Sequence, residues 1–473
     1  MNAPRERARG ALAIVLHTHM PYVEGFGTWP SGEEWLWEAM ASCYLPLLEL
    51  LDAGAPLTLS LTPVLCDQLE APAVYERFAA FVENVRRRTH EEDAAGLRAG
   101  GYEALARELE RSFCDYTRAL ERLRARGGDL LAALMRHAQW TSAATHAVLP
   151  LLASDAALRL QVAGGIAAHR RRCAQRWRGG FWLPECAYAP WLERGLEDAG
   201  VSAVCVELTN HFGLGAVEHL HPIASACGVL LVPVDRETMS LVWSEHGYPA
   251  SGAYRDYHHH TVHHHNPWNN DGGEYDHASA LALARAHAGD FVSRTRARLH
   301  AAGGEGLVVC ALDTELLGHG WYEGRWWLRA VVEECERQGL ELLRLDDALA
   351  RVQPTSPFTP GVCSWGKDGD LSTWSGPAVA EMAFATRAAE LSLLRAGEHA
   401  RSTAVRELLA LQASDWPFMV SRELAGPYPR ERFQAHRQAL AGALERDLAG
   451  ERSQRDGPRN LAIDADPRLL LAP

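Results

Sequence analysis

Short apolar segments alternate with helical segments along most of this 473-residue chain. Strands that alternate with helices form a parallel sheet, because each helix returns the chain to the start of the next strand. About seven strands can be counted, and no glycine-rich phosphate loop follows the first. The pattern predicts a closed or nearly closed barrel with its site at the carboxyl ends of the strands. The predicted strands are 11–16, 57–65, a strand-then-polar segment at 137–152, 181–183, 202–208, 229–234 and 306–312, and residues 341–345 end the series.

The remaining segments are divided by composition. Residues 74–136 are rich in Arg, Glu and Ala with apolar residues at helical spacing, which predicts a helical insertion beside the barrel. The predicted domains are the barrel at 1–352, a Pro-rich linker at 353–363, a helical C-terminal domain at 364–450 and a charged, loosely packed tail at 451–473. Further helices are expected near 36–53, 155–177, 277–302, 324–338, 376–413 and 428–449.

Composition excludes several classes of partner. The net charge of -13 argues against a nucleic-acid or anionic-membrane surface. The first apolar run, 11–16, leads into polar residues without a small-residue cleavage site, so it predicts a strand and not a signal peptide. No apolar run reaches the roughly 18 residues that span a membrane. The 10 cysteines form no C-x-x-C pair and are typical of reduced core residues, which predicts a cytoplasmic protein.

Glu185 follows a short buried strand and is surrounded in sequence by aromatic residues. The stretch 179–191 reads GGFWLPECAYAPW, so Trp182, Tyr188 and Trp191 accompany this acid. Apolar walls raise the pKa of a carboxyl group, and flat aromatic faces suit a sugar. The alternative is a strand-end glutamate that caps the following helix.

Asp313 ends another strand. The apolar segment 306–312 is expected to bring Asp313 to the same rim as Glu185, with His319 and Trp321 on the loop that follows. Paired carboxylates at strand ends are what glycoside hydrolysis requires, standing roughly 5–5.5 Å apart in a retaining enzyme. Capping of the next helix by Asp313 and Glu315 is the simpler alternative.

Two groups of histidines invite a metal interpretation. His17 and His19 alternate at the end of the first strand and so share a face, which suits either zinc or hydroxyl recognition. The runs 258–260 and 263–265 lie in a polar loop, where adventitious metal binding is plausible but no strand positions the imidazoles.

The ordered motifs HTHMPYV, SAATHAVLPLL, GFWLPECAY and ALDTELLGHGWYEG, a later SWG followed by W, and ASDWPF resemble glycoside hydrolase family 57, most closely its α-1,4-glucan branching enzymes. The resemblance implies a (β/α)7 barrel with a helical insertion and a helical C-terminal domain. It also implies a retaining mechanism without a metal or other cofactor, acting on α-glucans such as amylose and glycogen. Glu185 would be the nucleophile and Asp313 the general acid/base. The substrate-binding residues would be His17, His19, His146, Trp182, Arg255, His319, Trp321, Trp365, Trp374 and Asp415.

Two positions depart from that family pattern. Gln139 stands where the second motif usually has an acid, and the region 211–228 is short and lacks the tyrosine of the family's mobile loop. His211, His219 and His221 are the candidates for that covering role. Transfer to a sugar hydroxyl requires that water be kept from the glycosyl-enzyme, so a shorter loop favours more hydrolysis.

The sequence therefore predicts 1,4-α-glucan branching, with an α-amylase or a 4-α-glucanotransferase of the same family as the alternative. A zinc-dependent barrel hydrolase built on His17, His19 and Asp313, and a glucan-binding protein without activity, are the remaining hypotheses. Neither nucleic acid nor a membrane is expected as a partner.

Overall fold

The computed structural model describes residues 10–450 and 458–471. One sheet runs through the centre of the molecule, with the strand order β6-β7-β5-β4-β3-β2-β1-β8 and β9 paired to β1. The strands are β1 (Ala11–Thr18), β2 (Thr58–Leu61), β3 (Ala138–Ser142), β4 (Gly180–Trp182), β5 (Ala203–Val206), β6 (Ile223–Ala224), β7 (Leu230–Pro233), β8 (Leu307–Asp313) and β9 (Glu341–Leu342).

The strands from β7 to β8 along this order are all parallel, and there are seven of them among the described residues. The two outer strands of this series meet where the Asp235 N–H donates a hydrogen bond to the Val309 carbonyl, 2.9 Å away. The short strand β6 pairs with β7 in the antiparallel direction. The (β/α)7 barrel expected from the sequence is therefore confirmed.

The central strands are buried on both faces, which explains their uninterrupted apolar sequences. Every residue of β1 is buried, as are the first six of β8. Strands covered on both faces read as continuous apolar runs, because neither face meets water. Three predicted strands are shorter than expected: β2 ends before Pro63, which begins helix α3, β3 covers only the start of its segment, and β9 has two residues.

Helices surround the barrel and form two groups beside its rim. The barrel helices are α1 (Glu33–Ala39), α2 (Leu45–Asp52), α3 (Pro63–Leu69), α8 (Asp155–Arg172), α9 (Glu193–Asp198), α10 (Thr209–Phe212), α11 (Arg236–Met239), α12 (His277–Ala301), α13 (Gly324–Gln338) and α14 (Leu345–Leu349). The predicted insertion contains α4 (Val74–Ala80), a π-helical segment (Phe81–Arg86), α5 (Arg87–Ala99), α6 (Glu103–Ala125) and α7 (Leu130–Met135). The C-terminal region contains α15 (Ser372–Ser375), α16 (Ala380–Ala396), α17 (Ser402–Leu411), α18 (Asp415–Ser421) and α19 (Tyr428–Leu448).

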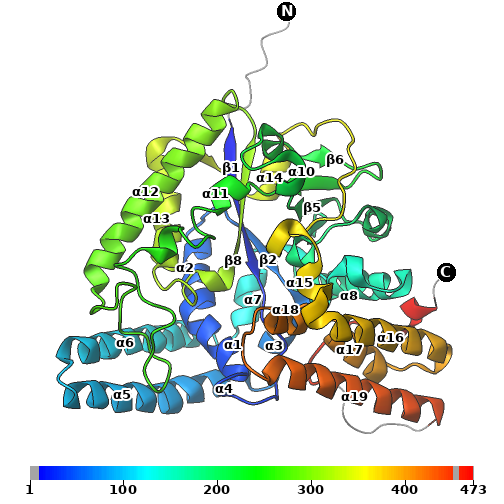
Figure 1. Cartoon of the computed structure of the whole chain (residues 1–473), viewed down its shortest axis with the longest axis horizontal. Helices are drawn as coiled ribbons and strands as arrows, with labels where there is room; N and C mark the ends of the chain where they lie inside the picture. Colours follow the sequence, from blue (N-terminus) through cyan, green and yellow to red (C-terminus); the bar gives the residue numbers. More distant parts are fainter. Residues whose placement is uncertain (1–9, 451–457, 472–473) are drawn as a thin grey trace, which may run out of the picture.

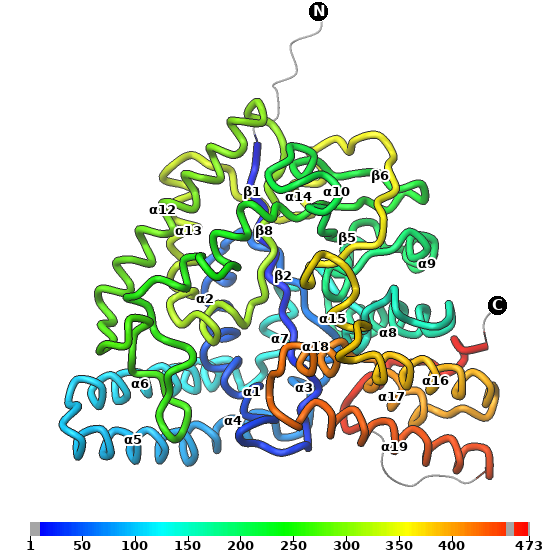
Figure 2. Tube along the Cα trace, viewed as in Figure 1, coloured from blue at the N-terminus to red at the C-terminus, as the bar shows by residue number. Residues whose placement is uncertain are grey.

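The two helical groups lie on either side of the end towards which the strands run. In Figure 1, β1 descends toward α18, the antiparallel pair α5 and α6 lies at the lower left, and α16, α17 and α19 lie at the lower right. The tube in Figure 2 shows the same arrangement without the ribbons. The carboxyl ends of the strands therefore point into the space between the insertion and the C-terminal helices.

The segments expected to be a linker and a tail are attached to the barrel. Tyr188 and Cys363 exchange two backbone hydrogen bonds, of 2.9 and 3.1 Å, and the Thr355 N–H donates to the Pro222 carbonyl. Within 458–471, Leu461 is fully buried and the Ala462 N–H donates to a carboxylate oxygen of Asp67 at 2.6 Å. The expectation of a loosely packed tail is wrong for those residues, while 451–457 and 472–473 lie outside the described part. The division into domains stays a prediction.

Within the described residues, no helix is both long and apolar enough to cross a membrane.

Two adjacent glycines in α8 give a test of how closely this helix packs on the barrel. A Cβ at Gly165 would lie 2.0 Å from the carbonyl oxygen of Ser142 at the end of β3. Gly165→Ala is therefore expected to lower the free energy of unfolding by about 1–3 kcal/mol, measured by urea denaturation. The matched control is Gly164→Ala, whose Cβ would meet only the Ala144 Cβ at 3.4 Å. That variant should equal the wild type or gain about 0.5 kcal/mol, and equal losses for both variants would contradict this packing.

Candidate active site

Glu185 is placed by an unusual turn of the backbone at the end of β4. It has a φ of 64° and the next residue, Cys186, a φ of 47°, so two successive non-glycine residues adopt the left-handed conformation. Each such residue costs on the order of 1–3 kcal/mol, and such conformations persist only where the surroundings hold them. Here the Trp365 N–H donates to the Glu185 carbonyl at 3.0 Å and the Cys186 N–H to that of Leu183 at 2.9 Å. The turn aims the Glu185 side chain into the site.

The Glu185 carboxylate accepts one hydrogen bond on each oxygen. The Trp365 indole N–H donates to Oε2 at 2.8 Å, and the Ser414 hydroxyl donates to Oε1 at 2.8 Å. Burial raises the pKa of Glu185, whereas these two donors act in the opposite direction by favouring the charged form. Both donors come from the region after the barrel, which thus completes the environment of this acid.

Asp313 ends β8, in register with His17 on β1. Burial raises the pKa of Asp313 well above its usual range, and the charges of Glu315 and Glu185 raise it further. A carboxylic acid that keeps its proton at neutral pH can act as a proton donor. When both are charged, the two strand-end acids repel one another. Their surroundings differ, because the Glu185 carboxylate accepts hydrogen bonds from two donors.

Three imidazole rings stack beside these acids. His17 stacks on the buried Trp182 with ring centres 4.6 Å apart, and His146 stacks on His19 at 3.9 Å. His17 Nε2 and His146 Nε2 are hydrogen-bonded at 2.9 Å, and His146 Nδ1 lies 2.8 Å from the Ser414 hydroxyl oxygen. Burial, together with the neighbouring His19, lowers the pKa of both His17 and His146 well below the usual value, so both rings are neutral.

His19 is the charged member of the group. Burial opposes its charge, but the Asp415 carboxylate, 2.9 Å from His19 Nε2, raises the pKa above its usual value, aided by Glu315 and Glu185. The His19 N–H donates to Glu315 Oε1 at 3.2 Å, and its Nδ1 is 3.2 Å from the Thr62 hydroxyl. These contacts favour the protonated form of His19, and a positive charge there in turn favours the ionised forms of the carboxylates.

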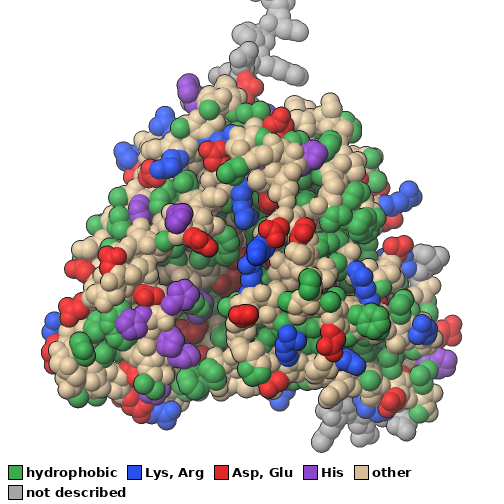
Figure 3. All heavy atoms as spheres, viewed as in Figure 1, with side chains coloured by type: hydrophobic (Ala, Val, Ile, Leu, Met, Phe, Trp, Pro, Cys, Tyr) green, Lys and Arg blue, Asp and Glu red, His purple; other side chains and the backbone are tan. Residues whose placement is uncertain are grey.

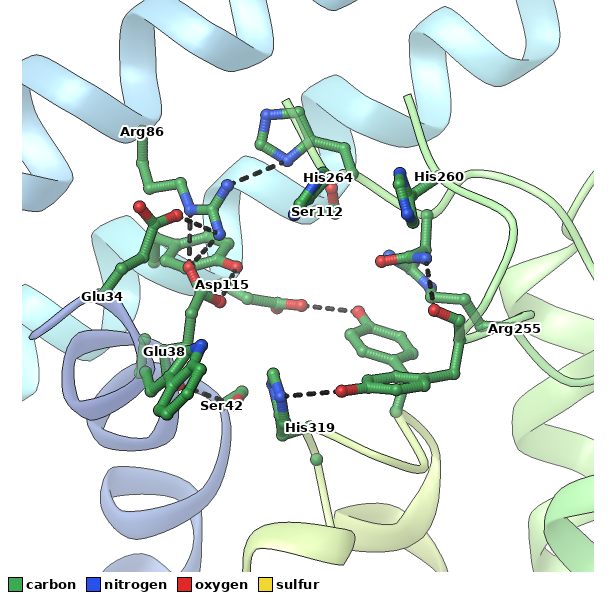
Figure 4. A pocket seen from close by; sticks show the side chains of 18 of the residues that line it. Glu34, Glu38, Ser42, Arg86, Ser112, Asp115, Arg255, His260, His264 and His319 are labelled. Atoms are coloured by element: carbon green, nitrogen blue, oxygen red, sulfur yellow. Dashed lines mark hydrogen bonds and ion pairs between the residues drawn. The ribbon is translucent and has the colours of Figure 1, made fainter. Parts of the chain in front are cut away.

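A pocket of about 360 Å³ opens between the insertion and the loop that precedes α12. Figure 4 shows Glu34, Glu38 and Arg86 on one wall, Arg255 and His260 on the other, and His319 at the base. Figure 3 shows histidine side chains gathered beside a hollow on this face. The lining also includes Trp29, Trp35, Tyr257, His258, His264, His265 and Tyr322.

Arg255 and His319 both belong to this pocket. The Arg255 guanidinium pairs with Glu108 and lies 3.7 Å from the ring centre of Tyr322. His319 Nε2 lies 3.3 Å from the Tyr257 hydroxyl. The pocket is lined by both of these predicted residues but not by Glu185 or Asp313.

Two predicted glucan contacts lie in the core. Trp321 is 1% exposed and packs between Tyr254 and Trp327, with ring centres 5.5 and 5.3 Å away. Trp374 is 2% exposed and packs with Val148 and Ala187. Both rings are largely covered by neighbouring side chains, and their contact with a glucan stays a prediction.

The two departures from the family pattern have structural explanations. The Gln139 side chain accepts a hydrogen bond from the Leu59 N–H at 2.8 Å, at the irregularity between β2 and β3. It supports a neighbouring strand and does not contact Glu185. In 211–228, His219 is buried with neither ring nitrogen bonded to a described residue, and His211 packs against Phe358.

The loop histidines are tied to their surroundings by separate contacts. His263 Nδ1 lies 2.8 Å from a carboxylate oxygen of Asp93, His259 stacks on Trp268 at 3.9 Å, and His265 packs against His90 at 3.7 Å. Among the described residues, no group of three or more His, Cys, Asp or Glu side chains is arranged to hold a metal ion. His146 does join His17 and His19, but its Nε2 is hydrogen-bonded to His17 Nε2 at 2.9 Å and its Nδ1 lies 2.8 Å from the Ser414 hydroxyl oxygen.

Sequence reasoning missed Ser414 and Glu315 as members of the site. Ser414 directly precedes the predicted Asp415, so the same motif contained it, but nothing in the sequence indicated that its hydroxyl bonds to Glu185. Glu315 follows Asp313 by two residues and accepts from the Tyr44 hydroxyl at 2.7 Å. Burial raises the pKa of Glu315 to about 7.

The chain is similar to known proteins over nearly its whole length. Residues 139–358 match the model of glycosyl hydrolase family 57, and residues 378–456 match the C-terminal domain of 1,4-α-glucan branching enzymes. A probable 1,4-α-glucan branching enzyme of Mycobacterium tuberculosis is 34% identical, over 98% of this chain and 96% of that protein. The 1,4-α-glucan branching enzyme of Thermococcus kodakarensis is 30% identical, over 95% of this chain and 77% of that protein.

Solved structures agree in fold. The family 57 branching enzyme of Thermococcus kodakaraensis, solved with glucose, has a TM-score of 0.86 at 28% identity and covers 98% of this chain and 96% of its own. That of Pyrococcus horikoshii has a TM-score of 0.83 at 29% identity, covering 94% and 97%. The sequence matches extend over both the barrel and the C-terminal helices, and from them we conclude that the chain belongs to glycosyl hydrolase family 57.

Proposed function

We propose that this protein is a retaining 1,4-α-glucan branching enzyme that cleaves α-1,4 linkages and forms α-1,6 linkages. The observation that carries this proposal is the pair of buried acids at the ends of β4 and β8, held in different ways. Glu185 has two hydrogen-bond donors that favour its charge, whereas burial and neighbouring carboxylates favour a protonated Asp313. The branching-enzyme relatives, and the match of the C-terminal helices to the branching-enzyme domain, support the choice of reaction.

In the first step Glu185 attacks C1 of an α-1,4-linked glucose unit while Asp313 gives its proton to the departing O4. The bond from C1 to O4 breaks, and a bond from C1 to the Glu185 carboxylate forms. A protonated His19 favours the ionised state of Glu185, and the buried rings of Trp182 and His17 stack on one another beside the site.

In the second step Asp313, now a carboxylate, removes the proton from a glucan 6-hydroxyl, whose oxygen attacks C1 and releases Glu185.

We assign the pocket beside the insertion to glucan binding. Its lining carries aromatic rings and imidazoles, among them Trp29, Tyr257 and His319, which suit a neutral polyhydroxyl chain.

The balance between transfer and hydrolysis depends on what covers Glu185. The histidines of 211–228 do not contact Glu185 in the described hydrogen-bond network, and the indole of Trp365 does. Asn210, beside this region, donates to the Asp368 carbonyl at 2.6 Å and so ties it to the loop that carries Trp365. The short region favours more hydrolysis or the formation of short branches, and the α-amylase and 4-α-glucanotransferase of the same family remain the alternative.

We further propose amylose- and glycogen-type glucans as substrates and a cytoplasmic location. Ten unpaired cysteines, seven of them buried, support a reducing environment for the protein.

Incubation with amylose tests the reaction itself. A branching enzyme lowers the iodine colour and creates linkages that a debranching enzyme cleaves, with few new reducing ends. If reducing ends accumulate in proportion to the colour loss and no debranching-sensitive linkages form, the protein is an amylase and the proposal of branching is wrong.

The assignment of the two acids predicts how amide variants behave. Asp313→Asn should lower kcat by on the order of 10²–10⁴-fold, and Glu185→Gln by at least as much, because each removes a step of the chemistry. Glu207→Gln is the matched control, since this strand-end acid of β5 accepts the Thr209 N–H at 2.8 Å and an amide oxygen can replace it. That control should retain activity within about twofold of the wild type. The rate of each variant is measured on amylose.

Glu315 is predicted to set the alkaline limit of activity. Asp313 must carry a proton to assist the leaving group, and the charge of Glu315 raises the pKa of Asp313. Glu315→Gln removes that charge but keeps an acceptor for Tyr44 and the His19 N–H. The alkaline limb of the kcat/KM profile should therefore move to lower pH, while the acid limb stays in place. An alkaline limb that does not move would show that Glu315 does not act on Asp313.

A further inference from the structure

A continuous chain of hydrogen bonds runs from Glu185 back into the barrel. Glu185 Oε1 is 2.8 Å from the Ser414 hydroxyl, which is 2.8 Å from His146 Nδ1. His146 Nε2 is in turn 2.9 Å from His17 Nε2. The last atom of the chain, His17 Nδ1, is buried and has no hydrogen-bond partner among the described residues. The four side chains come from the end of β4, the residue before α18, the turn after β3, and β1.

The direction of every proton in this chain follows from its members. An ionised carboxylate only accepts, so the single Ser414 proton points to Glu185. The Ser414 oxygen must then accept from His146, which places the proton of that ring on Nδ1. A neutral imidazole carries one proton, so His146 Nε2 is an acceptor and His17 must donate from Nε2. His17 Nδ1 is left as a bare acceptor.

Neutral rings are required for this order, and the surroundings favour them. His146 is stacked at 3.9 Å on His19, whose charge is held by Asp415. A second cation at His146 would be repelled by His19, and burial penalises it as well. His17 is enclosed by Trp182 on one face.

The opposite proton order is less favourable. It would turn the Ser414 proton toward His146, move the His146 proton to Nε2 and leave a buried N–H on His17 Nδ1 without an acceptor. It would also require that Glu185 carry a proton in order to bond to Ser414. Buried N–H groups without a partner are rare, so the chain favours the order with an ionised Glu185.

We propose that Ser414 is a positioning residue for Glu185, and that His17, two hydrogen bonds further back, fixes the direction in which the Ser414 proton points. His17 would thus help to keep Glu185 ionised without touching it. This inference deepens the proposed function, because it explains how a buried nucleophile stays charged.

The other charged groups that act on Glu185 are Asp313 from β8, His19 from the end of β1 and Asp415 from α18. Asp313 and Asp415 oppose its charge, and His19 favours it. None of these groups changes in the variants used below.

The ionisation of Glu185 can be followed without turnover through Trp365, whose indole N–H donates to Glu185 Oε2. The protein is labelled with 5-fluorotryptophan, and the ¹⁹F signal of Trp365, identified with Trp365→Phe among 15 tryptophans, is titrated with pH. Loss of that titration in Glu185→Gln assigns it to Glu185. In Ser414→Ala the midpoint should rise by about one pH unit, which corresponds to one lost hydrogen bond to a carboxylate.

Ser414→Thr keeps the hydroxyl and should stay near the wild-type midpoint. The matched control is Ser421→Ala at the end of α18, the helix that Ser414 precedes, because the Ser421 hydroxyl bonds to the Phe418 carbonyl at 3.0 Å. That variant should not shift the midpoint.

Two variants of His17 test the proton order. The amide of His17→Gln can reach the position of Nε2 and donate to His146, so its midpoint should stay near that of the wild type. His17→Asn reaches only the position of Nδ1. It leaves His146 free to change tautomer and turn Ser414 away, so its midpoint should rise as in Ser414→Ala. Equal midpoints in the wild type, Ser414→Ala and His17→Asn would overturn the proposal, as would equal rises in the two His17 variants.

The pH titration tests the hydrogen-bond chain independently of whether the protein turns over amylose. If the wild type shows no turnover of amylose, the proposed function fails. The titration midpoints of the variants still show whether the hydrogen-bond chain acts on Glu185. If turnover is present, the acid limb of kcat/KM should move with the NMR midpoint in Ser414→Ala. A uniform loss of rate at every pH would instead mark Ser414 as merely structural.

Discussion

A carboxylate that is buried in a protein needs hydrogen-bond donors in order to stay charged, since burial alone favours the neutral acid. In this protein both donors to the Glu185 side chain, Trp365 and Ser414, lie beyond the last strand of the barrel. The barrel supplies the acid and the turn that presents it. The C-terminal region supplies the groups that hold its charge, and Asp415 from α18 also holds the charge of His19. The two parts of the chain therefore form one chemical unit, whatever domain boundary is drawn between them.

The arrangement of the acids follows from the parallel sheet. Because β1, β4 and β8 all run in the same direction, their carboxyl ends bring His17, His19, Glu185 and Asp313 to one rim. The two acids then repel each other, which assists a mechanism that needs one of them charged and the other protonated. Glu315 adds a third carboxylate, and the imidazolium of His19 partly compensates for all three.

Much of the barrel could be predicted from the sequence, because buried parallel strands consist of continuous apolar runs and polar residues follow at their ends. The positions of Glu185 and Asp313 at the ends of two strands were predicted in that way. The burial of Trp321 and Trp374 could not be predicted, because an aromatic residue beside a motif suits the core as well as a sugar, and only the packing shows which side chains cover it. Ser414 was missed because its role depends on a contact across 229 residues, which no local pattern encodes. The lengths of β2 and β3 were overestimated, because polar or proline residues that follow an apolar start end these strands early.

The contacts of Glu185 also have a consequence for how the protein is made. Its partners Trp365 and Ser414 lie 180 and 229 residues further along the chain. During synthesis the barrel strands leave the ribosome well before these residues do, and contacts so distant in sequence close late in folding. The strained turn at Glu185 therefore gains its last supports only near the end of synthesis. The hydrogen-bonded environment of Glu185 is thus completed last, when nearly all of the chain is present.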